Sequence, residues 1–436
     1  MREDNKLIKE IEKEVFSIPI VDTHEHLISE QERRTLDLDI FFLFSHYTST
    51  DLVSSGMPED EYLKLFDTGI GEDVRWGMFE KYWPRIRNTN YSKIVLEAVR
   101  DLYEFDDINA SNHGKISRKI SDTKKSEWYD HVLSDKSRIK HILNFIENIP
   151  DIMDTSPIKR SDIIPVKNFV DIISVCCRED IVFFENKYDI SIYGLKDYLC
   201  MIDNIFKESI GIGYRALKIV LAYMREIYFE ETTFSEANRI FSRFYKLKEY
   251  GFLEKKDFLS KSELKPLQDY LVHYIIQKAI SYGLPIQIHS GLLDGNIGNI
   301  TGSNPAFLIN LFLKYRTGKF DIFHTGYPYT DVLISICKQF PNVYFNLCWI
   351  HDVSADLYGS ILQRVCEILP SNKVFGFGGD YKIVECIYAA QKTARRAIIS
   401  LLYGKIMEKY FSFDEAISYA QKILYKNPLS FYVPNK

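Results

Sequence analysis

The chain has 436 residues, of which 46% are hydrophobic and 26% charged, and 55 basic against 60 acidic residues leave a formal net charge of −5. No block rich in lysine or arginine stands out, so we expect no nucleic-acid or membrane partner, only a small-molecule substrate. One domain can account for this length, because barrels of eight β/α units exceed about 400 residues when their loops carry insertions.

The amino terminus predicts a charged amphipathic helix that is followed by the first strand. The opening residues MREDNKLIKEIEKEVFSIP lack the apolar centre of a secretory signal, and no stretch of the sequence reaches about 18 uninterrupted apolar residues. We therefore expect a cytoplasmic protein. The next run, PIVDTHEHL, is apolar and then polar, which is typical of a buried strand whose end opens on a site.

The rest of the chain predicts an α/β protein. Residues 28–137 follow aromatic-rich helical patterns, so we expect a helical insertion after strand one, and residues 225–283 exceed one crossover helix and predict extra helices. Seven further apolar runs each precede a helical pattern, which favours a single (β/α)8 TIM barrel over residues 1–436, with a doubly wound open sheet as the alternative. These runs are IKHILNFI, IIPVKNFVDIISV, YRALKIVLAY, LPIQIHS, KFDIFHTG, NVYFNLCWI and KVFGFGGD.

The cysteines are odd in number and include no C-x-x-C pair. Most have apolar neighbours, so we interpret them as reduced core residues and not as ligands of a soft metal. They are Cys176, Cys177, Cys200, Cys337, Cys348, Cys366 and Cys386.

Candidate metal ligands close several predicted strands. In strand one Asp22, His24 and His26 alternate, so they share one face, where two imidazoles can chelate an ion and the carboxylate can orient an imidazole. His289 closes PIQIHSG, and two further runs end in the same way: His324 closes FDIFHTG and Asp380 closes VFGFGGD. Because parallel strands of a barrel open at one mouth, these endings predict a metal centre there.

The ligand types indicate which metal the centre binds and what it does. Imidazole with carboxylate suits Zn²⁺ first, and Mn²⁺, Fe²⁺ or Ni²⁺ as well, as one or two ions. Such an ion lowers the pKa of a water molecule to about 7, and Asp380 can accept the proton. The pattern therefore favours hydrolysis.

This set of strand endings resembles the amidohydrolase superfamily between Val21 and Asp380. The resemblance implies that His24, His26 and His289 are ligands, that His324 binds a second ion or polarises the substrate, and that Asp380 is both ligand and catalytic base. Lys218 in RALKIVLAYMR stands where the superfamily often has a carboxylated lysine. Its alternative role is a cation that pairs with a substrate carboxylate, so the number of metals stays open.

Within the superfamily, the long insertion and the stretches LKIVLAYMR and HTGYPYTDVLISICKQFPNVYFNL look like the branch of uronate isomerases and of amidohydrolase domains fused to glutamine synthetase. WIHD after strand seven and GGDYKIVE after strand eight depart from the hydrolases. Arg225 is the candidate clamp for a substrate carboxylate, with a salt bridge to the next helix as its alternative, and His351 is a candidate acid or base, or a loop histidine. Other candidates for substrate binding are Tyr223, Tyr327, Trp349, Tyr381 and Glu385.

Four functions remain open at this point. The favoured one is a metal-dependent hydrolase, in which metal-activated water attacks an amide, lactone or ester of a small carboxylate-bearing substrate. The alternatives are an aldose–ketose isomerase of uronic acids, a decarboxylase and a non-catalytic binding module. We assign no role to His46, His113, His131, His141 or His273, although FSHYTSTDL can fold over the barrel mouth. Whether the chain forms a homo-oligomer is open.

Overall fold

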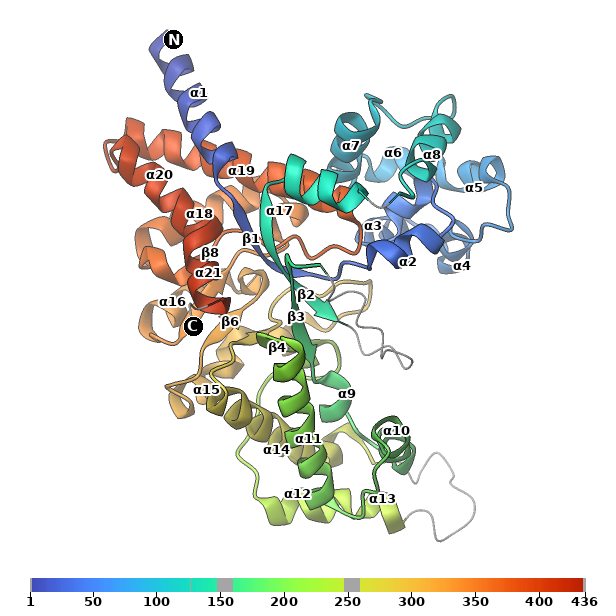
Figure 1. Cartoon of the computed structure of the whole chain (residues 1–436), viewed down its shortest axis with the longest axis vertical. Coiled ribbons are helices and arrows are strands. Elements are labelled where there is room, and N and C mark those ends of the chain that lie inside the picture. Colours follow the sequence, from blue (N-terminus) through green and yellow to red (C-terminus); the bar gives the residue numbers. More distant parts are fainter. Residues whose placement is uncertain (1, 126, 147–159, 247–258, 434–436) are drawn as a thin grey trace.

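Eight parallel strands in sequential order form the core of the computed structural model, which describes residues 2–125, 127–146, 160–246 and 259–433 (Figure 1). The predicted (β/α)8 barrel is confirmed, and each expected run contains one strand. The strands are β1 (Ile20–Glu25), β2 (Ile139–Ile146), β3 (Ile163–Asn168), β4 (Ala216–Ile219), β5 (Ile286–Ile288), β6 (Phe320–Ile322), β7 (Val343–Asn346) and β8 (Val374–Phe375).

Backbone hydrogen bonds between β1 and the segment that follows β8 close the barrel. The amides of Thr23 and His26 donate to the carbonyls of Phe377 and Tyr381, and the amide of Asp380 donates to the carbonyl of His24. Glycines permit this approach: a Cβ added at 379 would lie 2.1 Å from the Glu25 carboxylate, and one at 378 would lie 2.6 Å from the Thr23 hydroxyl. The glycine pair thus sets Asp380 beside strand one.

A group of helices lies between β1 and β2 and stands to one side of the barrel (Figure 1). It buries Trp83, whose indole N–H donates to the Ile108 carbonyl within the insertion, and Trp128, whose indole N–H donates to the Glu385 carboxylate outside it. Its elements are α2 (Glu30–Thr35), η1 (Ile40–Phe44), α3 (Thr48–Ser54), α4 (Glu59–Lys64), α5 (Glu72–Phe79), α6 (Trp83–Ile86), α7 (Asn90–Tyr103), α8 (His113–Ser121) and η2 (Asp130–Lys136).

Further helices surround the remaining strands. Between β3 and β5 lie α9 (Val170–Ile173), α10 (Arg178–Tyr188), α11 (Leu195–Ile212), η4 (Leu221–Tyr223), α12 (Phe234–Phe241), α13 (Arg243–Lys246) and α14 (Lys261–Ser281). The expected extra helices of 225–283 correspond to the last three, and residues 247–258 of that segment lie outside the described residues. After β5 come η7 (Ile300–Ser303), η8 (Pro305–Leu308), α15 (Ile309–Lys314), η9 (His324–Gly326), α16 (Thr330–Gln339), α17 (Ile350–Val353), α18 (Ala355–Ile368) and η10 (Ser371–Lys373).

The carboxyl-terminal helices, together with α1 (Arg2–Ser17), pack on the barrel, and the last of them closes its amino-terminal end. Phe431 and Tyr432 join the apolar cluster of the barrel interior, and the Tyr432 hydroxyl donates to the buried carboxylate of Asp321. Burial raises the pKa of Asp321 to about 7. This end is therefore a packed floor, and the opposite end holds the site. The helices are α19 (Val384–Met407), α20 (Phe413–Gln421), η11 (Lys422–Lys426) and α21 (Asn427–Tyr432).

Two sequence expectations concern the surface of the chain. Within the described residues, no helix has the length and apolar character needed to cross a membrane. The interpretation of all cysteines as core residues is wrong for three of them, because Cys176 and Cys200 are exposed and Cys177 is partly exposed. Apolar neighbours in the sequence do not predict burial of these cysteines, since Cys176 and Cys177 lie at the start of α10 and Cys200 lies on the outer face of α11.

Candidate metal centre

The end of β1 supplies two imidazoles to the barrel interior. His24 is fully buried, and the side chain of His26 is 19% exposed. The strand does not alternate regularly here, because the pairing with β2 shifts between Asp22 and Glu25. The expectation that Asp22 orients an imidazole is therefore wrong in this structure. Its carboxylate accepts the backbone N–H groups of His24 and Gly379 instead.

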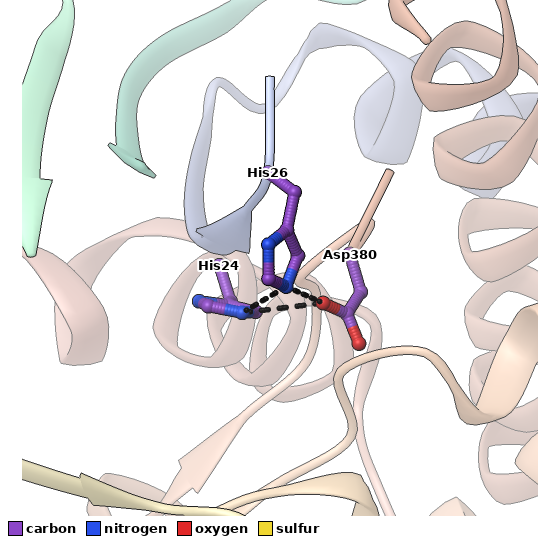
Figure 2. A group of neighbouring side chains, drawn as sticks. All are labelled: His24, His26 and Asp380. Atoms are coloured by element: carbon purple, nitrogen blue, oxygen red, sulfur yellow. Dashed lines mark hydrogen bonds and ion pairs between the residues drawn. The ribbon is translucent and has the colours of Figure 1, made fainter. Parts of the chain in front are cut away.

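His24, His26 and Asp380 converge on one point (Figure 2). The Nε2 atoms of the two imidazoles lie 3.2 Å apart, and each lies 3.2 Å from Asp380 Oδ1. Two ligand atoms that each lie about 2.1 Å from one ion have this spacing. Asp380 Oδ1 is buried and lacks a hydrogen bond of good geometry among the described residues. The donor set therefore fits a divalent cation.

The electrostatics keep these groups in the forms that bind a cation. Burial, reinforced by the charge of Lys218, holds the pKa of His24 well below its usual value, so its imidazole is neutral. Burial alone would raise the pKa of Asp380, but His24, His26 and Lys218 hold it well below its usual range. A neutral imidazole and an ionised carboxylate are what a divalent ion requires of its ligands.

A second group of donors adjoins the first. His324, Cys348 and Asp380 offer ligand atoms within 4.8 Å of one another. His324 Nε2 lies 3.0 Å from His289 Nδ1 and 3.8 Å from Asp380 Oδ2. Burial lowers the pKa of His289 to about 3 and that of His324 well below its usual value. The predicted His289 and His324 thus lie at the centre, but His289 Nε2 donates to the Leu292 carbonyl, so only its Nδ1 can face an ion.

Left-handed backbone conformations occur at the strand ends that carry this site. His324, Trp349 and Asp380 have φ angles of 62°, 67° and 61°. Such conformations are costly for residues other than glycine and persist only where the surrounding structure enforces them. Their clustering at one end of the barrel agrees with a functional role for this end.

Lys218 lies beside the first group. Its Nζ is 2.5 Å from His24 Nε2 and lies over the rings of Phe145 and Phe323. The side chain is 2% exposed, so polar groups of the site, and not water, must stabilise the charge of its ammonium group. This position serves either of the two predicted roles, a carboxylated ligand or a cation for the substrate.

A cavity of about 320 Å³ opens over the metal ligands. Four of its polar lining residues have no role predicted from the sequence: His46 and Tyr47 from the insertion, Asp294 after β5 and Lys382 after β8. They belong to loops and carry no strand-end pattern, although the proposal that FSHYTSTDL folds over the mouth pointed to His46. The lining also includes His26, Phe145, Val170, Lys218, Val220, Tyr223, Met224, His289 and Asp380.

A second cavity, of about 580 Å³, shares Asp294 with the first. Asp51, Asp294 and Asp356 line it, without any lysine, arginine or histidine among its lining residues. Trp349 forms part of its wall and lies between Tyr47 and His324, with ring centroids 4.9 Å and 5.2 Å away. The mouth therefore has a cationic part over the metal ligands and an acidic part beside it.

The predicted substrate-binding residues separate into two groups. Tyr223 lines the first cavity, and its hydroxyl accepts the Asp294 amide. Tyr381 is buried and packs on His46 and Tyr47, and Tyr327 packs partly buried on the core. His351 is fully buried at the start of α17, against Tyr358 and Phe377, and burial lowers its pKa to about 3. Tyr223 and Trp349 thus reach cavity walls, whereas His351 lies in the core.

Arg225 is not brought to the cavity as a clamp. Its guanidinium lies 2.6 Å from the carboxylate of Asp269 on α14 and donates to the carbonyl of Tyr228. The alternative interpretation, a salt bridge to the next helix, is right about the ion pair, but the partner lies on α14, beyond α12 and α13. Glu385 likewise does not reach the substrate cavity, because its buried carboxylate pairs with Arg33 of α2.

We expect Arg225→Gln to lower the free energy of unfolding by about 2 kcal/mol, because it removes one of the two cations that pair with the buried Asp269. Urea unfolding measures this loss. The Michaelis constant for a carboxylate substrate should stay within about twofold of the parent value. A large rise in that constant with unchanged stability would instead support the clamp.

Comparison with known proteins agrees with the site. Residues 246–432 match the amidohydrolase family. The matched residues make up less than half of the chain. The predicted resemblance is thereby confirmed, and the matched segment contains His289, His324 and Asp380. Over 180 residues the chain is also 31% identical to protein fluG of Emericella nidulans, an alignment that covers 40% of the chain and 21% of fluG. The chain thus matches about a fifth of the length of that relative.

Solved structures share the fold of the protein over nearly the whole chain. A uronate isomerase from Thermotoga maritima is 14% identical with a TM-score of 0.79, and the match covers 98% of this chain and 97% of the isomerase. A glucuronate isomerase from Caulobacter crescentus is 15% identical with a TM-score of 0.78, over 99% and 95%. A putative metal-dependent hydrolase from Lactobacillus casei is 15% identical with a TM-score of 0.66, over 96% of each chain. At these identities the likeness concerns the fold.

Proposed function

We propose that the protein is a metal-dependent hydrolase that acts on an amide, lactone or ester of a small carboxylate-bearing substrate. The observation that carries this proposal is the triangle of His24 Nε2, His26 Nε2 and Asp380 Oδ1, with 3.2 Å on each side, at the base of a cavity. Imidazole and carboxylate favour Zn²⁺ as the ion. Once bound, the ion would polarise the carbonyl and make a water molecule acidic enough to attack at neutral pH.

The chain's own residues provide the proton transfer. Asp380 Oδ1 faces the two imidazoles, while Oδ2 is directed to the side of His324, 3.8 Å from its Nε2. The low pKa of Asp380 keeps its carboxylate ionised, so Oδ2 can accept a proton from the attacking water and pass it to the leaving group. His324, whose imidazole is neutral, lies on the side of Oδ2 and can donate a hydrogen bond to the substrate carbonyl.

The cationic part of the cavity supports a carboxylate-bearing substrate. Lys218 and Lys382 both line the wall next to Asp380. Two ammonium groups in a cavity of this size favour an anionic group of the substrate through charge attraction. Since Arg225 is bound to Asp269, we assign the substrate carboxylate to these lysines.

We expect purified protein to hold about one equivalent of Zn²⁺ or a similar ion per chain, and His24→Ala to lower its affinity by at least about tenfold. Elemental analysis measures the content directly. His26→Ala is a second variant at a partly exposed position, and His131→Ala, a half-exposed histidine of the insertion, is the matched control that should keep the metal. No metal in the parent protein after supplementation would overturn the proposal.

An isomerase of uronic acids is the second candidate, supported by the likeness of the whole chain to two such enzymes and by His46, an imidazole of the cavity wall in addition to His26 and His289. An isomerase moves a proton between adjacent carbons and adds no oxygen. We expect turnover in ¹⁸O-labelled water to place one labelled oxygen in the new carboxylate, as mass spectrometry would detect. Uronic acid turnover without a label in any carboxylate would favour the isomerase.

A further inference from the structure

Two thiols and a carboxylate meet at the start of α10. Cys176, Cys177 and Asp180 each offer one ligand atom, and these atoms lie within 4.8 Å of one another. The group follows β3 and α9 on the outside of the barrel, and Cys176 is exposed to solvent. It is therefore accessible to an ion without passing through the cavity of the barrel.

The backbone holds this group in place. Asp180 Oδ2 accepts the amide N–H of Cys176 at 2.7 Å and of Cys177 at 3.2 Å, which fixes the carboxylate beside both thiols. Cys177 has an extended backbone with φ −151° and ψ 175° as the residue that caps α10. The nearest guanidinium, of Arg178, is paired with Glu185 at 2.7 Å and lies over the ring of Tyr245. The donors are thus arranged before an ion arrives, which lowers the cost of binding.

The chemistry of the donors selects the ion. Thiolates are soft ligands that prefer Zn²⁺ and Cd²⁺ over Mg²⁺ or Ca²⁺, and a carboxylate completes a set of three with one position left for water. Burial, with Asp180 nearby, raises the pKa of Cys176 to about 12, so the thiols stay protonated and unreactive without an ion. When an ion binds, two S–H bonds break, two metal–sulfur bonds form and two protons pass to solvent.

We propose that Cys176, Cys177 and Asp180 form a second metal site, separate from the barrel, that takes a thiophilic divalent cation of the Zn²⁺ and Cd²⁺ type. The site lies two residues from Ser174, whose hydroxyl contacts the sulfur of Met224 at 3.1 Å, and Met224 lines the substrate cavity.

Titration of the reduced, full-length protein with Cd²⁺, followed by the ultraviolet absorption of cadmium–thiolate bonds, tests the proposal. Cys176→Ser and Cys177→Ser should each weaken binding by at least about 100-fold, and Asp180→Asn by about tenfold. Cys200→Ser removes an exposed cysteine on α11 and should change nothing, and Cys348→Ser, near the barrel site, should leave the absorption in place. Because two protons leave, the affinity should rise by about 100-fold per pH unit near neutrality.

The result is independent of the barrel site, since His24→Ala should keep the cadmium–thiolate absorption. Absorption that survives in the double variant Cys176→Ser/Cys177→Ser would overturn the proposal, as would its absence from the parent protein. Circular dichroism of each variant checks the fold, which should be unchanged at these outer positions.

Discussion

Replacing Asp380 by asparagine is expected to lower kcat by about a thousandfold, the largest effect on activity at any single position we consider. The variant keeps the volume of the side chain but removes its negative charge and its ability to accept a proton. Asp380 contacts both His24 and His26 at 3.2 Å, so the metal content should fall as well. Steady-state kinetics on a substrate found by screening, with elemental analysis of the same preparation, measures both effects.

A matched control separates this loss from a general effect of changing a buried carboxylate. Asp321 is also fully buried inside the barrel, but it lies at the floor, bonded to Asn346 and Tyr432. Burial raises the pKa of Asp321 to about 7, so its neutral, protonated form is present near neutrality. Asparagine resembles that form. Asp321→Asn should therefore keep kcat within about threefold of the parent value. Equal losses in the two variants would remove Asp380 from its proposed role.

The barrel and most of the centre were predictable because local patterns specify them. An apolar run of strand length that ends in a histidine or aspartate predicts both a strand and the polar residue at its carboxyl end. Parallel strands of a barrel then bring such ends together. His24, His26, His289, His324 and Asp380 were found in this way, and all of them lie at the centre.

The features of the site that the sequence does not predict depend on contacts between distant segments. His46, Asp294 and Lys382 reach the cavity from loops, whose paths follow from tertiary packing and not from periodicity. The partner of Arg225 is Asp269, 44 residues later in the sequence. A side chain near a strand end can thus form an ion pair with a distant helix, and no local sequence pattern predicts that partner.

The same limit applies within β1. Strict alternation predicted one common face for Asp22, His24 and His26, but the pairing with β2 shifts between Asp22 and Glu25. A bulge changes which residues face the interior and leaves no clear trace in a six-residue strand. Asp22 consequently accepts the backbone N–H of Gly379, in the loop that carries Asp380.

The largest expected effect on stability is at the ion pair between Arg33 of α2 and Glu385 of α19. The two side chains are 1% and 0% exposed, and Glu385 also accepts hydrogen bonds from Tyr103 and Trp128 of the insertion. Removing one partner leaves the other charge buried without compensation. We expect Arg33→Met and Glu385→Gln each to lower the free energy of unfolding by about 3 to 5 kcal/mol.

The double variant Arg33→Met/Glu385→Gln decides whether the pair acts as a unit. Because each single change already forfeits the interaction, the double variant should be destabilised by clearly less than the sum, with a coupling energy of about 2 kcal/mol in urea unfolding. Arg364 and Asp331 offer a control pair on the surface, where side chains that are 41% and 79% exposed should give at most about 1 kcal/mol. Strict additivity at Arg33 and Glu385 would mean that the two side chains contribute to stability independently. Strong coupling would mean that this buried pair is one of the contacts that hold the insertion, which carries His46 and Tyr47 of the cavity wall, to α19.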